Sequence, residues 1–223
     1  MESLITACLF FLGMHWIISG SPLRTPIVNL LGEKLFKALF ALTIAGSLIW
    51  MGMAFAAAPY IETWGTATAL KPVSLVLMFF AFLMLTTGAL DKNPTTLGLV
   101  PPDQVEARGM VRITRHAGLL GLGLWGLAHL IVNGDVASHW LYGTIAFEGL
   151  IAPLNLDRKY RARYGEAWKK FTEQTSYLPF VAIISGRNKL VLSELNIWGA
   201  LVGVGLFAFV LYFHQSWFGA SPL

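Results

Sequence analysis

Hydrophobic residues are gathered in long runs, and short polar segments separate these runs. Several of them extend for 17 or more residues without a charged side chain. Six approach the roughly 20 apolar residues that a membrane-spanning helix needs. The pattern therefore predicts an all-α fold, a polytopic membrane helix bundle of about six transmembrane helices. The expected spans are Leu4 to Ser19, Leu35 to Ala57, Pro72 to Leu90, Arg115 to Val132, Val136 to Pro153 and Leu195 to Phe213.

Composition agrees with a membrane protein. The chain has 223 residues, 56% hydrophobic and only 13% charged, whereas about a quarter of an average soluble domain is charged. No polar linker is long enough to introduce a second domain, so residues 1–223 are expected to form a single integral membrane domain. The first run lacks a basic start and a small-residue cleavage site, which favours a retained span over a cleaved signal peptide.

The distribution of basic residues predicts the orientation. Of the 16 Lys and Arg residues, 15 lie in or beside the loops after spans one, three and five, and only Lys71 lies on the other side. The positive-inside rule puts those loops in the cytoplasm. We therefore expect both the N- and the C-terminus to lie on the side away from the cytoplasm. The same rule explains the net charge of +4 without nucleic acid as a partner, and leaves the lipid bilayer as the expected partner.

The segment between spans five and six has a pattern of its own. Aromatic and aliphatic residues recur there at helical spacing, while most Lys and Arg residues fall between them. This is typical of a cytoplasmic amphipathic helix that lies in the headgroup region with its aromatic side chains embedded. Anchoring and a ligand-facing role are both open for it. The apolar positions are Leu156, Tyr160, Tyr164, Trp168 and Phe171.

Histidines are the candidate chemical groups, because an ionisable residue at membrane depth is costly unless it serves a purpose. His15 lies several residues inside the first span, where a neutral imidazole needs a hydrogen-bond partner or a metal. His116 and His129 lie at the two ends of the fourth span. His139 and His214 lie near the outer surface, where amphipathic rings are common. From the residues alone, His15 is equally a metal ligand or a structural histidine.

The start of the fourth span is the richest position. Arg112, Arg115 and His116 form a cationic cluster suited to an anionic group such as a propionate, a carboxylate or a lipid phosphate. Positive-inside flanking explains the two arginines equally well. Four glycines follow on the same helix, and they permit close approach by another helix or by a flat cofactor. These are Gly118, Gly121, Gly123 and Gly126.

The segment RITRHAGLLGLGLWGLAHLIVNGD resembles the NnrU family, which is similar to the 15-cis-zeta-carotene isomerases of plants and cyanobacteria. The first-span histidine followed by LGEKLFKALFAL, the RYGEAW segment and the closing TSYLPFVAI resemble that family too. The resemblance implies a membrane-embedded haem b protein. The histidines that match His15 and His129 are the proposed axial ligands of the isomerases, and the one that matches His116 is also important.

The resemblance implies two alternative functions, one for each branch of the family. The NnrU branch is associated with nitrite and nitric oxide metabolism in denitrifying bacteria, so that the haem would act by redox or ligand-binding chemistry. The isomerase branch would take a polyene, and an enzyme of this kind would be a haem-dependent cis-trans isomerase. A cysteine of the isomerases, proposed to exchange with an iron ligand, falls where this chain has Gly126.

Helix geometry limits the ligand set. His116 and His129 are 13 residues apart, which is about 20 Å of rise on a regular helix, so both cannot bind one iron. His15 lies about 8 Å from the cytoplasmic end of its span, nearer in depth to His116. The resemblance favours His129. We therefore expect His15 and His129 as ligands, with His116 as the rival and Arg112 and Arg115 beside the cofactor.

Three further possibilities stay open. The RHAG motif and the basic segment also resemble the isoprenylcysteine and phospholipid methyltransferases, which bind S-adenosylmethionine, although Ala117 replaces their proline and only Asp157 remains of their acidic pair. A structural protein without cofactor is the simplest alternative. The oligomeric state is undetermined, since the small-residue pair Gly199 and Gly203 in span six permits packing within or between chains.

Overall fold

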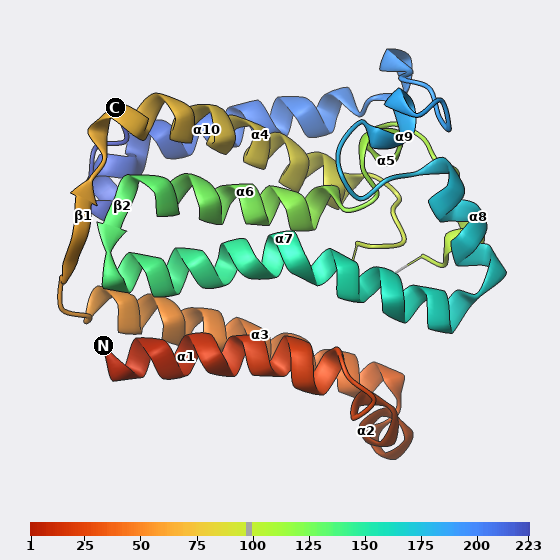
Figure 1. Ribbon diagram of the computed structural model, residues 1–223, viewed down its shortest axis with the longest axis horizontal. Helices are drawn as coiled ribbons and strands as arrows, with labels where there is room; N and C mark the ends of the chain where they lie inside the picture. Colours follow the sequence, from red (N-terminus) through yellow and green to blue (C-terminus); the bar gives the residue numbers. More distant parts are fainter. Residues whose placement is uncertain (97–99) are drawn as a thin grey trace. The chain divides into compact units, whose positions relative to one another are not determined.

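The computed structural model describes residues 1–96 and 100–223, and the chain divides into two compact units (Figure 1). Unit 1 comprises residues 1–67 and 129–145, and unit 2 comprises residues 68–128 and 146–223. Two helices pass from one unit into the other. Each unit is described below by itself.

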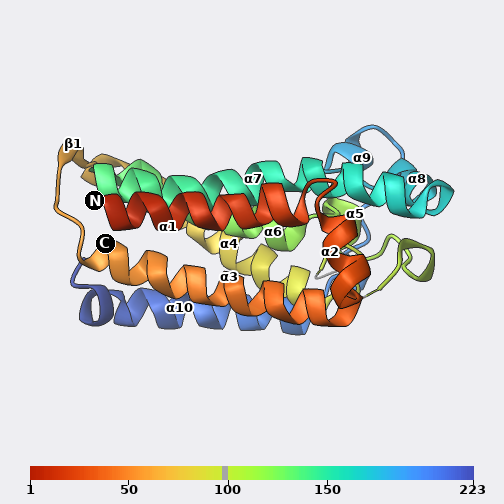
Figure 2. The ribbon, with the colours of Figure 1, turned by 90° about the horizontal axis from the view of Figure 1, so that it is seen from below.

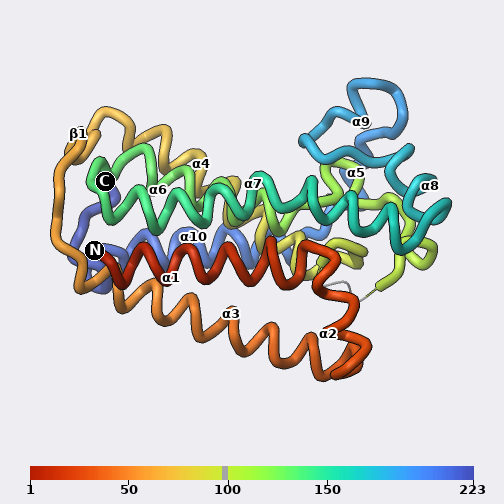
Figure 3. The backbone as a smooth tube through the Cα atoms, turned by 60° about the horizontal axis from the view of Figure 1, so that its bottom comes forward, coloured from red at the N-terminus to blue at the C-terminus, as the bar shows by residue number. Residues whose placement is uncertain are grey.

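Unit 1 begins with a helical hairpin. Helix α1 (Glu2–Gly13) continues into a π-helical turn (Met14–Ser19), and the short α2 (Arg24–Leu31) leads into α3 (Glu33–Ala56). Figures 2 and 3 show α3 returning beside α1. The indole of Trp50 near the end of α3 donates a hydrogen bond to Ser3 Oγ at 3.0 Å, so the hairpin is antiparallel.

A two-stranded antiparallel sheet closes unit 1. Strand β1 (Glu62–Thr66) follows α3, and strand β2 (Asn133–Asp135) lies between α6 (Ala117–Val132) and α7 (Val136–Tyr164). The expected loops after spans two and four are thus joined by strand pairing. The sheet itself was not predicted, because both strands are short, polar and rich in glycine.

Unit 2 has α4 (Lys71–Leu90) and α10 (Ile197–Phe218) as its longest helical pair, side by side in Figure 1. The Lys71 ammonium donates to the backbone carbonyls of Ser221 and Leu223, so α4 starts where the chain ends. Among the described residues, unit 2 also has three shorter helices and three 3₁₀ turns. The helices are α5 (Met110–Ile113), α8 (Glu166–Gln174) and α9 (Val181–Ile184). The turns are Thr68–Leu70, directly before α4, Pro102–Gln104 and Leu192–Glu194, and most of α6 and α7 belongs to unit 2 as well.

Four helical segments in the described residues are long and apolar enough to cross a membrane. They are Glu2–Ser19, Glu33–Ala56, Thr68–Leu90 and Ile197–Phe218. The largely helical fold with membrane-spanning helices is therefore confirmed at this coarser level. At the other two expected spans the structure has α6, which is apolar but has only 16 residues, and α7, which has 29. Six spans remain a prediction.

The basic segment after span five differs from its prediction. Helix α7 runs without interruption from Val136 through Pro153 to Tyr164, and Gly165, at a φ of 50°, ends the helical path before α8 starts. Leu156 to Phe171 is thus divided between two helices. A proline inside a helix removes one backbone hydrogen bond, and its ring crowds the carbonyl of the residue four positions earlier; here the helix nevertheless continues past Pro153.

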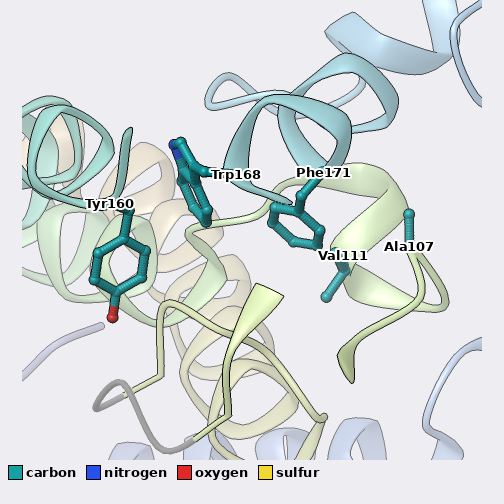
Figure 4. Packing of buried hydrophobic residues seen from close by; sticks show 5 residues of the cluster. All are labelled: Ala107, Val111, Tyr160, Trp168 and Phe171. Atoms are coloured by element: carbon teal, nitrogen blue, oxygen red, sulfur yellow. The ribbon is translucent and has the colours of Figure 1, made fainter. Parts of the chain in front are cut away.

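Three of the four aromatic residues of that segment are buried in protein. Tyr160, Trp168 and Phe171 pack against Ala107 and Val111 in a buried cluster of unit 2 (Figure 4). Trp168 is completely buried there, and its ring lies edge-on to Tyr160 at 5.0 Å between centroids. The helical spacing of these residues was correctly recognised, but their apolar face meets protein.

Candidate functional site

The most buried group of ionisable residues lies at the start of α6. Arg115 and His116 occupy the extended turn between α5 and α6, and both contact Asp157 of α7. His116 Nε2 donates to Asp157 Oδ1 at 2.7 Å, and Arg115 Nε donates to the same oxygen at 3.1 Å. Arg115 Nη2 forms a second bond with Asp157 Oδ2, so the pairing is bidentate. His116 is completely buried.

Two loops hold the backbone of this turn in place. The Arg115 carbonyl accepts hydrogen bonds from the Asn93 amide (2.9 Å) and the Thr95 hydroxyl, and the Arg115 N–H donates to the Ser176 carbonyl at 3.0 Å. Next to it, the Thr114 hydroxyl donates to the Tyr177 carbonyl at 2.6 Å. All of these partners belong to other segments of unit 2, so the backbone of the turn is held from several sides.

The charges of the cluster set the form of the histidine. Burial by itself raises the pKa of Asp157, but the hydrogen bonds from His116 and Arg115 outweigh it, so the pKa lies below its ordinary value. Asp157 is therefore a carboxylate, an acceptor only. A completely buried imidazole disfavours a second proton. His116 is then neutral, with its proton on Nε2 and a lone pair on Nδ1.

The Nδ1 atom of His116 is buried and has no hydrogen-bond partner among the residues that the structure describes. Trp168 Nε1 is the other buried side-chain nitrogen there without one. A buried polar atom without a partner is rare and calls for an explanation such as a ligand. A histidine that ligates a metal normally donates its other ring N–H to a carboxylate or carbonyl. The pairing of His116 with Asp157 has that form.

Arg112 does not belong to this cluster. Its guanidinium makes a two-point ion pair with Glu194, with Nε–Oε2 at 2.7 Å and Nη2–Oε1 at 3.0 Å. Hydrogen bonding to Arg112 lowers the pKa of Glu194 to about 2. An open cavity of about 780 Å³ lies beside this ion pair and not at His116, and both cations and anions line it. The cationic cluster of the sequence is thus divided, and each arginine is neutralised by a carboxylate of the chain.

His15 lies in the π-helical turn of unit 1. Its Nδ1 is 2.9 Å from the Phe11 carbonyl, and its ring packs against Phe11 at 4.5 Å and edge-on to Phe40 at 5.4 Å between centroids. Single π-helical turns are rare and often lie at functional sites. The ring is partly exposed and is surrounded by aromatic groups from α1 and α3.

His129 also belongs to unit 1, but it lies at another level. Its ring stacks on Tyr142 at 4.7 Å with an angle of 18°, and Tyr142 packs against Phe55 at 5.6 Å. His15 packs against Phe40, which lies 15 positions before Phe55 on α3. On a regular helix this separation is about 22 Å of rise, so the two histidines lie at different levels of unit 1. Metal–imidazole bonds are about 2 Å long. The structure does not bring His15 and His129 together as ligands of one iron.

Two of the four glycines of α6 contact neighbouring helices closely. A Cβ at Gly121 would lie 2.9 Å from the Ala81 carbonyl oxygen of α4, and one at Gly123 would lie 3.0 Å from the carbonyl carbon of Gly149 in α7. Of the two roles that the sequence left open, the structure shows helix packing at these two positions. A flat cofactor has no space there.

Sequence reasoning missed two carboxylates. Asp157 was considered only as a remnant of a methyltransferase motif, although it holds both Arg115 and His116. Glu148 is 4% exposed and interrupts the apolar run of the expected fifth span, a signal that was present in the sequence. His139 and His214 lie outside the cluster. His139 packs on Trp64 at 4.4 Å, and His214 Nδ1 is 2.8 Å from the Ala220 carbonyl.

These features define an α-helical protein with helices of membrane-spanning length and a buried histidine–carboxylate–arginine cluster. The chain belongs to the NnrU family, whose model, described as NnrU protein, matches residues 3–222. It is also similar to two plant proteins named 15-cis-zeta-carotene isomerase, chloroplastic. The protein from Arabidopsis thaliana is 33% identical over 178 residues, which cover 73% of this chain and 45% of the relative.

The second relative, from Zea mays, is 36% identical over 122 residues, which cover 52% of this chain and 31% of the relative. The chain therefore matches less than half the length of either plant protein. No solved structure matches the chain.

Proposed function

We propose that this protein is a membrane-embedded isomerase that changes the configuration of a double bond in a polyene dissolved in the bilayer. The observation that carries the proposal is the buried His116, with Nε2 bound to Asp157 and Nδ1 left without a partner. It supports a site prepared for a ligand. The similarity to two 15-cis-zeta-carotene isomerases supports the class of substrate.

The donor that would hold a haem iron in this proposal is Nδ1 of His116, although the 780 Å³ cavity lies beside the Arg112–Glu194 ion pair and not at His116. His116 would hold the iron through Nδ1, whereas His15 and His129 lie at levels about 22 Å apart along α3. When bound, a haem would supply one-electron chemistry at an iron whose properties depend on its axial ligand. We therefore propose His116, the rival of the expected pair, as the ligand in place of His15 and His129.

The neighbouring residues have defined tasks in this proposal. Asp157 accepts the hydrogen bond from His116 Nε2–H, which fixes the tautomer and makes Nδ1 the electron-pair donor, and it raises the basicity of the ring. Arg115 fixes the carboxylate in turn through two bonds. Because the turn is clamped by Asn93 and Ser176, the ring keeps one orientation.

An absorption spectrum of the purified protein in detergent, first oxidised and then reduced, tests the cofactor. We expect a Soret band after expression with adequate haem supply, and its loss or shift in His116→Ala. His139→Ala is the matched control and should keep the wild-type spectrum. A missing Soret band in the wild type would refute the haem. A spectrum that changes in His15→Ala and His129→Ala but not in His116→Ala would restore the original pair.

Carotenoid analysis tests the reaction. The chain would be expressed in a cell that accumulates a 15-cis-zeta-carotene and lacks its own isomerase. We expect the 15-cis isomer to decrease and the product isomer to appear, and His116→Ala to abolish the conversion. If cells that express the wild-type protein have the same isomer ratio as cells with an empty vector, the isomerase proposal is wrong.

Gly126 favours a second candidate, a redox or ligand-binding role in nitrite and nitric oxide metabolism. The isomerases have a cysteine where this chain has Gly126, so a ligand exchange that uses that thiol is absent here. In this case nitric oxide would shift the Soret band of the reduced protein, and a deletion strain would lose nitric oxide reduction. Under this reading the protein lies in a bacterial inner membrane with periplasmic termini.

A further inference from the structure

The segment between α8 and α10 displays an unusual number of large apolar side chains. Ile184 is 82% exposed and Leu192 is 70% exposed, and four more large apolar residues between 178 and 192 are also exposed. These are Leu178, Phe180, Val181 and Leu190. Exposed apolar residues that are gathered in this way mark an interaction surface. We call residues 178–192 the α9 loop.

A buried residue and backbone hydrogen bonds anchor the α9 loop to the rest of unit 2. Ala182, in α9, is completely buried, and its N–H donates to Ser176 Oγ at 3.0 Å. The Phe180 N–H donates to the Ile113 carbonyl at 2.9 Å, which holds Phe180 at a φ of 67°. A left-handed conformation of a bulky residue persists only where its surroundings impose it. The loop is thus held in one shape with its apolar side chains outward.

Hydrogen bonds within the loop satisfy many of its backbone N–H and carbonyl groups. The N–H groups of Ile184, Ser185 and Gly186 donate to loop carbonyls, and the Asn188 N–H donates to the Ala182 carbonyl at 3.0 Å. The Arg187 guanidinium donates to the carbonyls of Thr172, Thr175 and Glu173 at the end of α8. Satisfied backbone groups are the condition for placing irregular chain against lipid.

The position of the loop identifies its partner. It leads directly into α10, a candidate span whose first residues, Ile197 and Trp198, are 62% and 73% exposed. Trp is typical of the membrane–water interface. Lys189 is exposed among the apolar residues of the loop, as expected beside lipid phosphates. The exposed apolar residues of the loop are therefore followed directly in the chain by the exposed apolar face of α10, a candidate span.

We propose that the α9 loop is an interfacial anchor, which inserts Ile184 and Leu192 into the headgroup–acyl boundary of the bilayer at the end where α10 begins. It takes the role that the sequence assigned to residues 156–171, whose aromatic side chains are buried in protein. The partner is the lipid surface. The proposal holds for either candidate function, because it depends only on residence in a membrane.

Nitroxide labels test the depth of the loop. Single cysteines would be introduced into the full chain with Cys8→Ser, which removes the native thiol, in vesicles of phosphatidylcholine and phosphatidylglycerol. The label at Ile184→Cys is compared with Leu201→Cys on the exposed face of α10 and with Glu173→Cys on α8. We expect relaxation of the Ile184→Cys label by dissolved oxygen to exceed relaxation by a water-soluble nickel chelate severalfold, as at Leu201→Cys, with the reverse ratio at Glu173→Cys.

Two outcomes would overturn the proposal. A label at 184 that responds to nickel as strongly as the label at 173 would place the loop in water. A label shielded from both reagents would show that protein, such as a second copy of the chain, covers the loop. Leu192→Cys repeats the measurement on the same surface, so that a folding defect of one variant does not decide the result.

Discussion

Asp157 is the residue on which the buried cluster depends, because it alone neutralises Arg115 and binds His116. Asp157→Asn keeps the shape but leaves the Arg115 charge buried without a counter-charge. Removing one partner of a buried ion pair typically costs about 3 kcal/mol or more. We expect a loss of unfolding free energy near that size in detergent, measured by denaturant titration. Asp103→Asn on the exposed surface is the control, and equal losses in both variants would contradict the role of Asp157.

Glu194 gives the structure a defined response to acid. Its pKa is about 2 in the folded protein and 4.5 ordinarily, so the folded form binds fewer protons than the unfolded chain between these values. The stabilisation is complete above pH 4.5 and is lost as the pH falls towards 2. Thermal unfolding of wild type and Glu194→Gln should therefore differ at pH 6 and converge near pH 2. A difference in melting temperature that is constant over this range would exclude the effect.

The candidate residues were only partly predictable from sequence. His116 stands out because a histidine follows two arginines at the edge of an apolar run, and its burial is what such a position suggests. Its carboxylate is 41 positions away in the chain, so only the fold brings them together. Arg112 and Arg115 resemble each other in sequence, yet they bind different carboxylates. No local pattern separates them.

Helix α7 owes its tight packing to one glycine. A Cβ at Gly149 would meet the backbone of Gly123 and the carbonyl oxygen of Leu119, both in α6. Gly149→Ala should therefore destabilise the protein by about 1–3 kcal/mol through overpacking. Gly143 is the matched control, because it lies on the same helix with nothing within 4 Å of an added Cβ. Gly143→Ala should be neutral or stabilising, by up to about 1 kcal/mol, in the same denaturant titration.

The two variants are informative as a pair. Both replace glycine by alanine in one helix, so they share the gain in helix propensity and differ in the space around the Cβ. If Gly149→Ala were as stable as Gly143→Ala, α6 and α7 would not be in close contact. Packing of Gly203 against the Thr86 hydroxyl of α4 gives span six a partner within the chain in the same manner.

At the level of elements, the apolar runs predicted helices well and their ends poorly. The first, second, third and sixth runs correspond to the four segments of spanning length. The fifth run was ended at Pro153, but α7 continues for 11 further residues, to Tyr164. The β1–β2 sheet could not be predicted, because its pairing joins residues about 70 positions apart, Glu62 with Asp135, and neither strand has an alternating pattern.

For the whole molecule, the sequence predicts which loops and chain ends lie on each side of the membrane. Within unit 1, strand pairing joins the loop after α3 to the loop after α6. Within unit 2, Lys71 binds the carbonyls of Ser221 and Leu223 near the start of α4. The charge pattern predicts that all these segments share one side of the membrane, since 15 of 16 Lys and Arg residues lie in or beside the other loops. Which side faces the cytoplasm follows from the positive-inside rule and is open to direct measurement.

A membrane-impermeant thiol reagent measures this orientation. In the full chain with Cys8→Ser, Trp64→Cys on β1 is compared with Lys170→Cys on α8, and both positions are exposed. In intact spheroplasts we expect the reagent to label position 64 and not position 170, because only the sparsely charged side faces outward. Disruption of the membrane should make both positions reactive, which controls for access. Labelling of position 170 alone would invert the topology, and labelling of both would mean that β1 and α8 lie on the same side.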